Sequence, residues 1–288
     1  MVTLPQSRNP PPANAVNNLL TIDLEDWFHG IELPRSAWGN CQSRIERSTQ
    51  TLLDILDTKN VKATFFVLGQ VAATCPILVT RIAAAGHEIG THGYEHRFVY
   101  QLSPSEFSAD LGRSIRVLED LTGRPVAGHR APYFSINRNS FWAFEILAQH
   151  GIRYDSSIFP IRNYRYGIPD APRHPHEIHT KNGDILELPV STVQHFGTNL
   201  SFAGGFYLRF FPYWMLRRAI RSLHREGLPA ILYLHPWELD PEHPRMNLPA
   251  RIKLTHYHNL RSTESKLNSL LDEFDFQPVS AMLSNQRN

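Results

Sequence analysis

Short apolar runs alternate along this chain with longer segments whose apolar residues recur at helical spacing. Leu19–Ile22, Ala63–Leu68 and Ala230–Leu234 have the form of buried strands, whereas residues 45–56 and 212–226 carry a helical stripe. Buried parallel strands are usually joined by helices, so this alternation predicts an α/β fold of parallel strands wrapped by helices, either open or closed into a barrel. A chain of 288 residues is long enough for one such domain.

The same patterns predict how the chain is organised. The predicted strands lie at residues 19–22, 63–68, 87–90, 128–130, 152–155, 185–190, 230–234 and 276–282, and the predicted helices at 45–56, 76–83, 104–118, 140–149, 212–226 and 266–274. Residues 1–18 are rich in Pro and Asn, so we expect a disordered leader ahead of a single domain over 19–288. Residues 160–183 lack a period and are interpreted as a loop insertion, and 240–288 as a C-terminal extension of the same domain.

The charge of the chain argues against a nucleic-acid partner. Lys and Arg number 29 against 27 Asp and Glu, a net charge of +2, and no basic run stands out. Cys41 and Cys75 lack metal-like spacing, and a disulfide framework is not expected. The N-terminus lacks the basic start and apolar run of a secretory signal, and no apolar stretch approaches a membrane span, so we expect a cytoplasmic protein without a transmembrane segment.

Polar residues recur where the predicted strands end. These positions are Asp23 to Asp26, His92 to His96, Arg130, Asp155 and His235. In folds of parallel strands and helices, the loops at that end of the strands converge on one opening. Each residue taken singly has an ordinary surface or core role as the alternative, but five strands that end in this way predict a functional site there.

His92 and His96 are spaced for one helical turn, which would put both imidazoles on one face, close enough to share a metal ion. With 15 His in the chain, one such pair is also expected by chance, as a core or surface pair. Two imidazoles and one carboxylate make a three-ligand site that leaves a coordination position open for catalysis. A further carboxylate as base and a third histidine as acid would suit hydrolysis of an amide.

The motifs together resemble the polysaccharide deacetylases of the NodB-homology type, carbohydrate esterase family 4. The resemblance runs from about Leu19 to Val279, with the motifs in the family's order. The run Asp23-Leu24-Glu25-Asp26-Trp27-Phe28 is most similar to the first motif of the exopolysaccharide-locus (PEP-CTERM/exosortase-associated) deacetylases. The resemblance implies a distorted (β/α) barrel of about seven parallel strands.

The resemblance also implies roles for the first two motifs. Asp23 is expected to be the catalytic base, and His92 and His96, which match the family's His-x-x-x-His motif, the imidazole ligands of a metal. The sequence departs from the usual pair of adjacent aspartates, so Glu25 and Asp26 compete for the third ligand position. We prefer Asp26, because a short carboxylate past the strand end needs less reach, and keep Glu25 as the alternative.

Further motifs supply the remaining expected catalytic groups. In His129-Arg130-Ala131-Pro132-Tyr133-Phe134, the resemblance implies that Arg130 pairs with the base and that the backbone N–H of Tyr133 faces the oxyanion. Asp155 is expected to orient the acid, His235. The family's usual Leu two residues before that histidine is Tyr233 here, a change that concerns the wall of the groove.

Aromatic residues near these motifs are candidates for sugar binding. Trp27 and Trp237 could form a wall for pyranose rings, with packing at the rim as the alternative. Residues 204–209 are a Gly-rich turn that lacks the lysine and spacing of a phosphate loop, so we interpret them as a loop near the site.

By resemblance, the function is metal-dependent N-deacetylation of N-acetylated sugars in a bacterial exopolysaccharide or its precursor. The expected cofactor is a divalent metal, zinc first, with cobalt, nickel or manganese as alternatives, and the expected partner is an N-acetylated oligo- or polysaccharide. Hydrolysis of a small amide, as by allantoinase-like relatives on the same fold, is the alternative. A carbohydrate-binding protein without catalysis is a further one, although it would need neither a base, an acid nor an open metal site.

Overall fold

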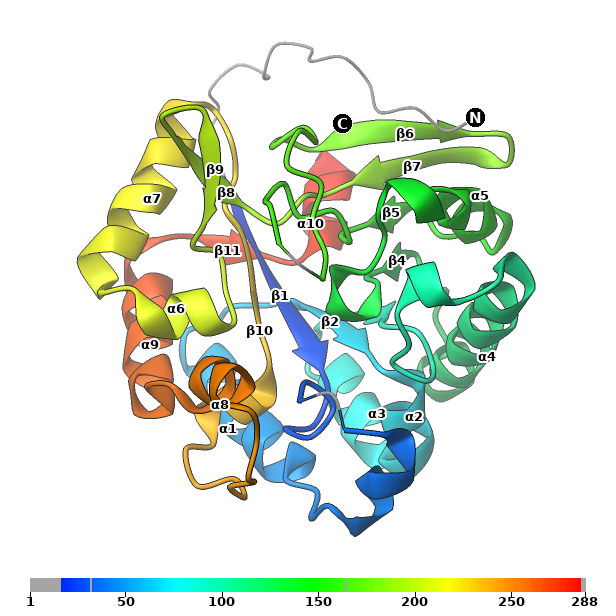
Figure 1. Cartoon of the computed structure of the whole chain (residues 1–288), viewed down its shortest axis with the longest axis horizontal. Coiled ribbons are helices and arrows are strands. Elements are labelled where there is room, and N and C mark those ends of the chain that lie inside the picture. Colours follow the sequence, from blue (N-terminus) through cyan, green and yellow to red (C-terminus); the bar gives the residue numbers. More distant parts are fainter. Residues whose placement is uncertain (1–16, 32, 164, 286–288) are drawn as a thin grey trace.

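A row of seven parallel strands forms the centre of the molecule (Figure 1). The computed structural model describes residues 17–31, 33–163 and 165–285. In spatial order the strands are β10 (Ile231–Leu234), β1 (Asn18–Leu24), β2 (Thr64–Val67), β3 (Glu88–Thr91), β4 (Gly128–His129), β5 (Tyr154–Asp155) and β7 (Gly183–Glu187). Each neighbouring pair is parallel. The predicted parallel α/β fold of about seven strands is confirmed.

The two ends of this row meet, which gives the distorted barrel. The chain that leaves β7 reaches the outer edge of β10, where the Ser191 N–H donates to the Ile231 carbonyl and the Ile231 N–H to Ser191 Oγ. The Gly-rich turn lies along the same edge, since the Gly205 N–H donates to the Tyr233 carbonyl. Gly204 has φ +151°, and a Cβ there would lie 1.8 Å from that carbonyl oxygen, so only glycine allows this approach.

Shorter strands extend the sheet or stand apart from it. β6 (His176–Thr180) pairs antiparallel with β7, and β11 (Phe276–Gln277) pairs parallel with β1. β8 (Thr192–His195) and β9 (Thr198–Ser201) form a separate hairpin. Because β1 pairs with β2, β10 and β11, the first strand of the chain joins its N-terminal and C-terminal parts in one sheet.

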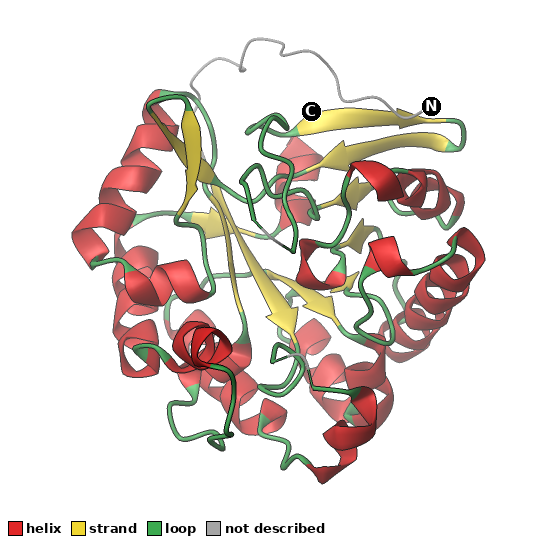
Figure 2. Ribbon diagram, in the orientation of Figure 1, coloured by secondary structure: helices red, strands yellow, loops and turns green. Residues whose placement is uncertain are grey.

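Helices cover the outside of the strands (Figure 2). They are α1 (Ile45–Thr58), α2 (Gly69–Thr74), α3 (Pro76–Ala84), α4 (Pro104–Thr122), α5 (Trp142–Gln149), α6 (Phe206–Phe210), α7 (Tyr213–Arg225), α8 (Ala250–Tyr257), α9 (Thr263–Glu273) and α10 (Val279–Asn285), with 3₁₀ turns at Arg35–Asn40, Val99–Gln101, Pro132–Phe134, Arg138–Ser140, Pro236–Leu239 and Leu260–Ser262. Within the described ranges, no helix has both the length and the hydropathy to cross a membrane.

The longest helix, α4, shows how the sequence sets these elements. Ser103 and Glu106 form a capping box at its start, and Gly123 ends it with φ 64°. Its apolar stripe, which includes Leu111 and Leu118, is buried in the same core as the central strands. The helix predicted over 104–118 is confirmed and extends one turn further, to Thr122.

Three predictions about the elements need correction or lie outside the structure. The run 276–282 is a strand only to Gln277, and α10 follows Pro278, a residue that favours the first turn of a helix. The insertion 160–183 is irregular only in its first part, since its end forms β6 and the start of β7. Of the predicted leader, residues 1–16 lie outside the described residues, and β1 already begins at Asn18.

Candidate active site

The carboxyl ends of the strands converge on one pocket, as the sequence predicted. Asp23 lies near the end of β1 and Glu25 directly after it. His92 and His96 follow β3 and His235 follows β10, and all five residues line a cavity of ≈ 290 Å³. All except His235 are almost fully buried. Side chains from strands far apart in the sequence therefore meet where the parallel sheet has its open end.

Glu25, His92 and His96 form a group that fits a divalent metal. Their ligand atoms all lie within 4.8 Å of one another, and Glu25 Oε2 is 2.6 Å from His96 Nε2. The His92 Nδ1–H donates to the Arg130 carbonyl at 2.8 Å, which leaves Nε2 for a metal. Burial lowers the pKa of His92 to about 4, so its imidazole is neutral, as a ligand must be.

The Glu25 side chain also fits a metal ligand, because its surroundings favour the charged carboxylate. Burial alone would raise the pKa of its carboxyl group, but His96 and the other nearby imidazoles outweigh burial and hold the pKa below its ordinary value. Two imidazole nitrogens and one carboxylate oxygen are the donor set of a catalytic divalent site with an open position. A second group of possible ligands, Glu177, His179 and Asp184 on the β6–β7 hairpin, lies on the surface, with all three residues exposed.

The preference for Asp26 as third ligand is corrected by these contacts. The Asp26 carboxylate points away from the histidines and accepts hydrogen bonds from the Ser43 hydroxyl at 2.5 Å and from the Arg44 N–H at 3.0 Å. It also accepts from the Trp27 N–H at 2.9 Å. Asp26 thus ties the loop after β1 to the start of α1, and Glu25, the alternative, lies with the histidines.

The helical turn expected for the two histidines is also corrected. His92 and His96 lie in an irregular loop after β3, with φ 71° at Gly93 and 54° at His96. The Asp110 carboxylate of α4 accepts from the Tyr94 N–H at 2.7 Å and fixes this loop. The imidazole centroids are 5.3 Å apart, so a loop achieves the proximity that a helix would have given.

Asp23 and Arg130 form a buried ion pair at the base of the pocket. Arg130 Nη1 donates to Asp23 Oδ1 at 2.8 Å and to Thr21 Oγ1 at 2.9 Å. Its remaining groups donate to the Ser156 carbonyl and hydroxyl, so the guanidinium is fully engaged and has no exposed surface. The second oxygen of Asp23 lies 3.9 Å from His235 Nε2, across the pocket.

His235 is held by Glu238, a residue that the sequence analysis missed. The His235 Nδ1–H and its backbone N–H donate to Glu238 Oε1 at 2.8 and 3.0 Å, and Arg209 Nε donates to Glu238 Oε2 at 2.7 Å. Burial opposes the charged imidazole, but Glu238, Glu25 and Asp23 together raise the pKa of His235 to about 9. The His-x-x-Glu spacing around Pro236 was the available signal, because it closes a local turn.

Two family models match this chain. The model described as "Polysaccharide deacetylase" matches residues 39–154, and a "Domain of unknown function (DUF3473)" matches 156–284. Residues 39–154 therefore match the polysaccharide deacetylase family, and the rest of the matched chain falls under a second model.

Individual relatives match parts of the chain. A peptidoglycan-N-acetylglucosamine deacetylase of Bacillus cereus is 39% identical over 98 residues, 34% of this chain. A peptidoglycan deacetylase-like protein of Gibberella zeae is 35% identical over 137 residues, 47% of this chain. Each alignment spans only 36% of the relative's own length. A Mycobacterium smegmatis protein named as a candidate polysaccharide deacetylase has the same fold, with a TM-score of 0.65, 22% identity, and coverage of 99% of this chain and 95% of its own.

Contrary to expectation, no contact joins Asp155 to His235 among the described residues. Asp155 lies opposite His129 in the register of β4 and β5, and the His129 Nδ1–H donates to its carboxylate at 2.6 Å. The Ser157 N–H and hydroxyl donate to the same carboxylate, so its contacts are with His129 and Ser157. Burial and the Asp155 charge raise the pKa of neighbouring Glu187 well above its ordinary value, which keeps that carboxyl neutral.

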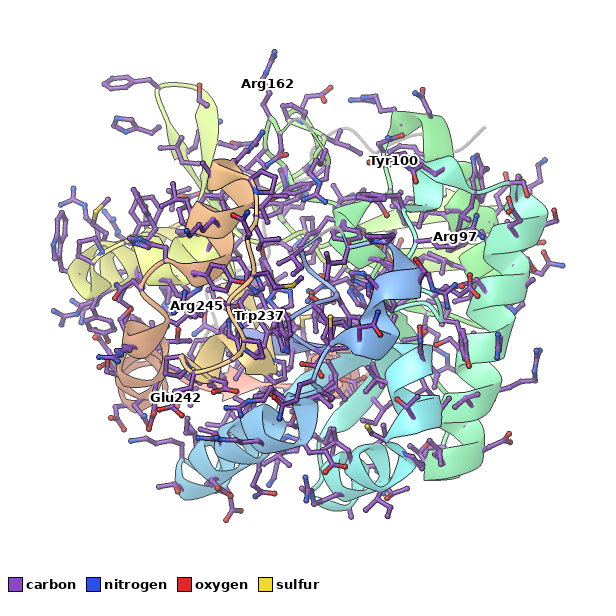
Figure 3. The ribbon with its side chains drawn as sticks, turned by 60° about the horizontal axis from the view of Figure 1, so that its bottom comes forward. Arg97, Tyr100, Arg162, Trp237, Glu242 and Arg245 are labelled. Atoms are coloured by element: carbon purple, nitrogen blue, oxygen red, sulfur yellow. The ribbon has the colours of Figure 1, made fainter. Side chains whose placement is uncertain are left out.

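The two tryptophans predicted to bind sugar differ in position. Trp27 is buried in a separate cluster, where its Nε1–H donates to the Gln42 carbonyl and its ring stacks on His243, so it does not line the pocket. Trp237 does line it and stacks between His235 and His256, at centroid distances of 5.3 and 4.3 Å. Figure 3 shows Trp237 in the middle of the view.

The remaining wall combines Tyr133 and the Gly-rich turn region, both expected near the site, with segments for which no particular site residue was predicted. Tyr133 lies in the pocket with φ 57°, and its hydroxyl donates to the His29 carbonyl at 2.7 Å. Arg251, Thr255 and His256 of α8, in the C-terminal extension, face the pocket, as does Tyr207 of α6 in the Gly-rich turn region. Arg165 of the insertion completes the wall.

Proposed function

We propose that this chain is a metal-dependent N-deacetylase that hydrolyses the acetamide group of N-acetylated sugar units. The single observation that supports this proposal most is the shared pocket. A metal-ligating group, a carboxylate held by Arg130 and an imidazole held by Glu238 lie around one cavity. Amide hydrolysis needs these three functions together, because water must lose a proton and the departing amine must gain one.

Each residue has one step in this proposal. Glu25, His92 and His96 hold the metal, which when bound polarises the acetamide carbonyl and lowers the pKa of water. Asp23 accepts the proton of the attacking water, while Arg130 keeps its carboxylate in place. His235 donates a proton to the departing amine, and its pKa of about 9 keeps it protonated at neutral pH.

The oxyanion and the metal are assigned on chemical grounds. The backbone N–H of Tyr133 remains our candidate donor to the oxyanion, because the residue lines the same pocket. Two histidines and one carboxylate are a common ligand set of catalytic zinc, so zinc is the first metal to test, with cobalt, nickel and manganese beside it.

The substrate class follows from the pocket wall and from the relatives. The aromatic side chains of Trp237, Tyr207 and Tyr133 line the cavity, and such a lining suits contact with pyranose rings. The Bacillus cereus relative is named for deacetylation of N-acetylglucosamine in peptidoglycan. We propose an N-acetylated polysaccharide, an exopolysaccharide or its precursor, as the substrate, and the cytoplasm as the site of action.

A small amide is the second candidate, and the pocket size supports it. A cavity of ≈ 290 Å³ is at the lower end of the usual range for small-ligand pockets, so one sugar ring or one compact amide would fill it. Side-by-side turnover of allantoin and of N-acetylglucosamine oligomers separates the two.

The deciding experiment measures acetate release from N-acetylglucosamine oligomers. We expect activity with added zinc, loss of activity with a chelator, and loss in His92→Ala. His179→Ala, a substitution at an exposed histidine on β6, is the matched control and should retain activity. Turnover that survives both the chelator and His92→Ala would rule out the proposed mechanism.

A further inference from the structure

One exposed face of the molecule is built from α7 and the neighbouring hairpin. Trp214, Arg217, Arg218, Arg221 and Arg225 are all exposed, and their spacing of three or four residues puts them along one side of the helix. The opposite side is buried in the core through Leu216, Ala219, Ile220 and Leu223. The helix is therefore fixed to the protein, and its arginine side faces outward.

This side keeps a positive charge after its known ion pairs are counted. Arg217 and Arg221 share one carboxylate, that of Glu273, at 2.5 and 2.7 Å. Arg218 and Arg225 add two more guanidinium groups on the same side. Four arginines against one glutamate leave the face strongly basic, although the chain as a whole has a net charge of only +2.

Large apolar side chains lie at both ends of the arginines. Trp214, at the start of α7, is 63% exposed, and Phe210, just before it in α6, is 51% exposed. Phe196, at the tip of the β8–β9 hairpin, is 94% exposed. The hairpin lies beside α7 in Figure 1. Exposed aromatics next to basic groups are unusual on a surface that meets only water.

We propose that this basic aromatic face, formed by Phe196, Phe210, Trp214, Arg217, Arg218, Arg221 and Arg225, docks on an anionic lipid surface. Aromatic rings prefer the headgroup level of a bilayer, and guanidinium groups bind lipid phosphates there. Single-stranded nucleic acid would also attract the arginines and stack on the rings, but it is usually bound in a basic groove that follows its backbone, whereas these arginines lie on the outer side of a helix. The face lies outside the pocket, so the proposal does not depend on the proposed catalysis.

The position of α6 connects this face to the pocket. Phe206 and Tyr207 of that helix line the pocket, whereas Phe210, at its end, belongs to the basic aromatic face. Docking would therefore hold the pocket close to the lipid surface. Sugar chains attached to a lipid, or made at a membrane, would then be within reach.

Co-sedimentation of the full chain with vesicles tests the proposal. The vesicles contain phosphatidylcholine alone or with phosphatidylglycerol. The test variant is Arg218→Glu/Arg225→Glu, which avoids the two arginines paired with Glu273. The control is Arg116→Glu/Arg124→Glu, which makes the same charge change at exposed residues on or just after α4, on the opposite side of the molecule (Figure 1).

The wild-type chain is expected to bind the anionic vesicles, more weakly at high salt, and the phosphatidylcholine vesicles poorly. Each lost arginine should weaken binding about fivefold, so the test variant should bind at least about 25-fold more weakly, while the control binds like wild type. Trp214→Ala should also weaken binding. Equal loss in both double variants, no binding of wild type to anionic vesicles, or binding of single-stranded nucleic acid without vesicle binding would each overturn the proposal.

Discussion

The choice between Glu25 and Asp26 is the sharpest test of the site, because the two adjacent carboxylates have opposite surroundings. We predict that Glu25→Gln removes the metal and that Asp26→Asn does not. The Glu25 carboxylate is 2.6 Å from His96 Nε2 and supplies the only anionic ligand of the described group. Since changes even to residues that support a ligand cost about 10 to 100-fold in affinity or activity, the loss of the ligand itself should reduce activity by more than about 100-fold.

The Asp26→Asn substitution should reduce stability instead. Its carboxylate accepts hydrogen bonds from the Arg44 N–H at 3.0 Å and from the Ser43 hydroxyl at 2.5 Å. An asparagine amide has no negative charge to strengthen these bonds, and its NH₂ group cannot accept one. A hydrogen bond to a charged group contributes about 1.5–3 kcal/mol. Burial raises the pKa of Asp26, so the cost of burying the charge offsets part of this hydrogen-bond energy. We therefore expect a net loss of about 2 kcal/mol in the free energy of unfolding.

Both variants are measured in the same way: metal per chain by atomic emission, acetate release, and urea unfolding. The expected pattern is a folded, metal-poor, inactive Glu25→Gln protein and a less stable, metal-loaded, active Asp26→Asn protein. If Asp26→Asn loses the metal while Glu25→Gln retains it, the geometry has been misread and Asp26 is the ligand.

Further predictions concern the groups around His235. Glu238→Gln leaves Arg209 as an uncompensated buried cation, so the free energy of unfolding measured in urea should fall by about 3–5 kcal/mol. A fall below about 1 kcal/mol would contradict the importance of this ion pair. Trp237→Phe keeps a ring beside His235 but removes a buried N–H that has no acceptor among the described residues and is therefore available to a substrate. Steady-state kinetics should show KM for N-acetylglucosamine oligomers raised about five to tenfold, with little change in kcat. In metal-free protein, the raised pKa of His235 stabilises the fold fully below about pH 6.5, and this stabilisation is lost as the pH rises through about 9. Unfolding of wild type should depend on pH over that window, and Glu238→Gln should flatten the dependence.

Much of the fold was predictable because the central strands are apolar runs buried on both sides. The hairpin strands were missed, although β6 carried a signal: His176 and Ile178 are buried while Glu177 and His179 are exposed, the alternation of a strand with one covered face. The last run, 276–282, was wrongly predicted to be a strand over its whole length. Its residues favour a strand, but Pro278 marks the start of a helix, and that local signal was the correct one.

The residues at the strand ends were predictable, but their pairing was not. The register places Asp155 opposite His129, and the hydrogen bonds from His129 and Ser157 to its carboxylate depend on strand pairing that no spacing in the sequence reveals. The choice of Glu25 did have a signal in the sequence. Side chains alternate along an extended chain, so a residue two after Asp23 points to the same side, and the residue after it points away.

The site is not contained in either segment that the family models match. Asp23 and Glu25 precede the first matched segment, which begins at residue 39, and His235 lies in the second, which begins at 156. The sheet explains how these parts meet, because β1 pairs with β2 on one side and with β10 on the other. The proposed base Asp23, the proposed ligand Glu25 and the proposed acid His235 thus depend on the pairing of β1 with a strand some two hundred residues later in the sequence. A chain reduced to the matched residues 39–154 would keep His92, His96 and Arg130, yet it would lack all three of those side chains.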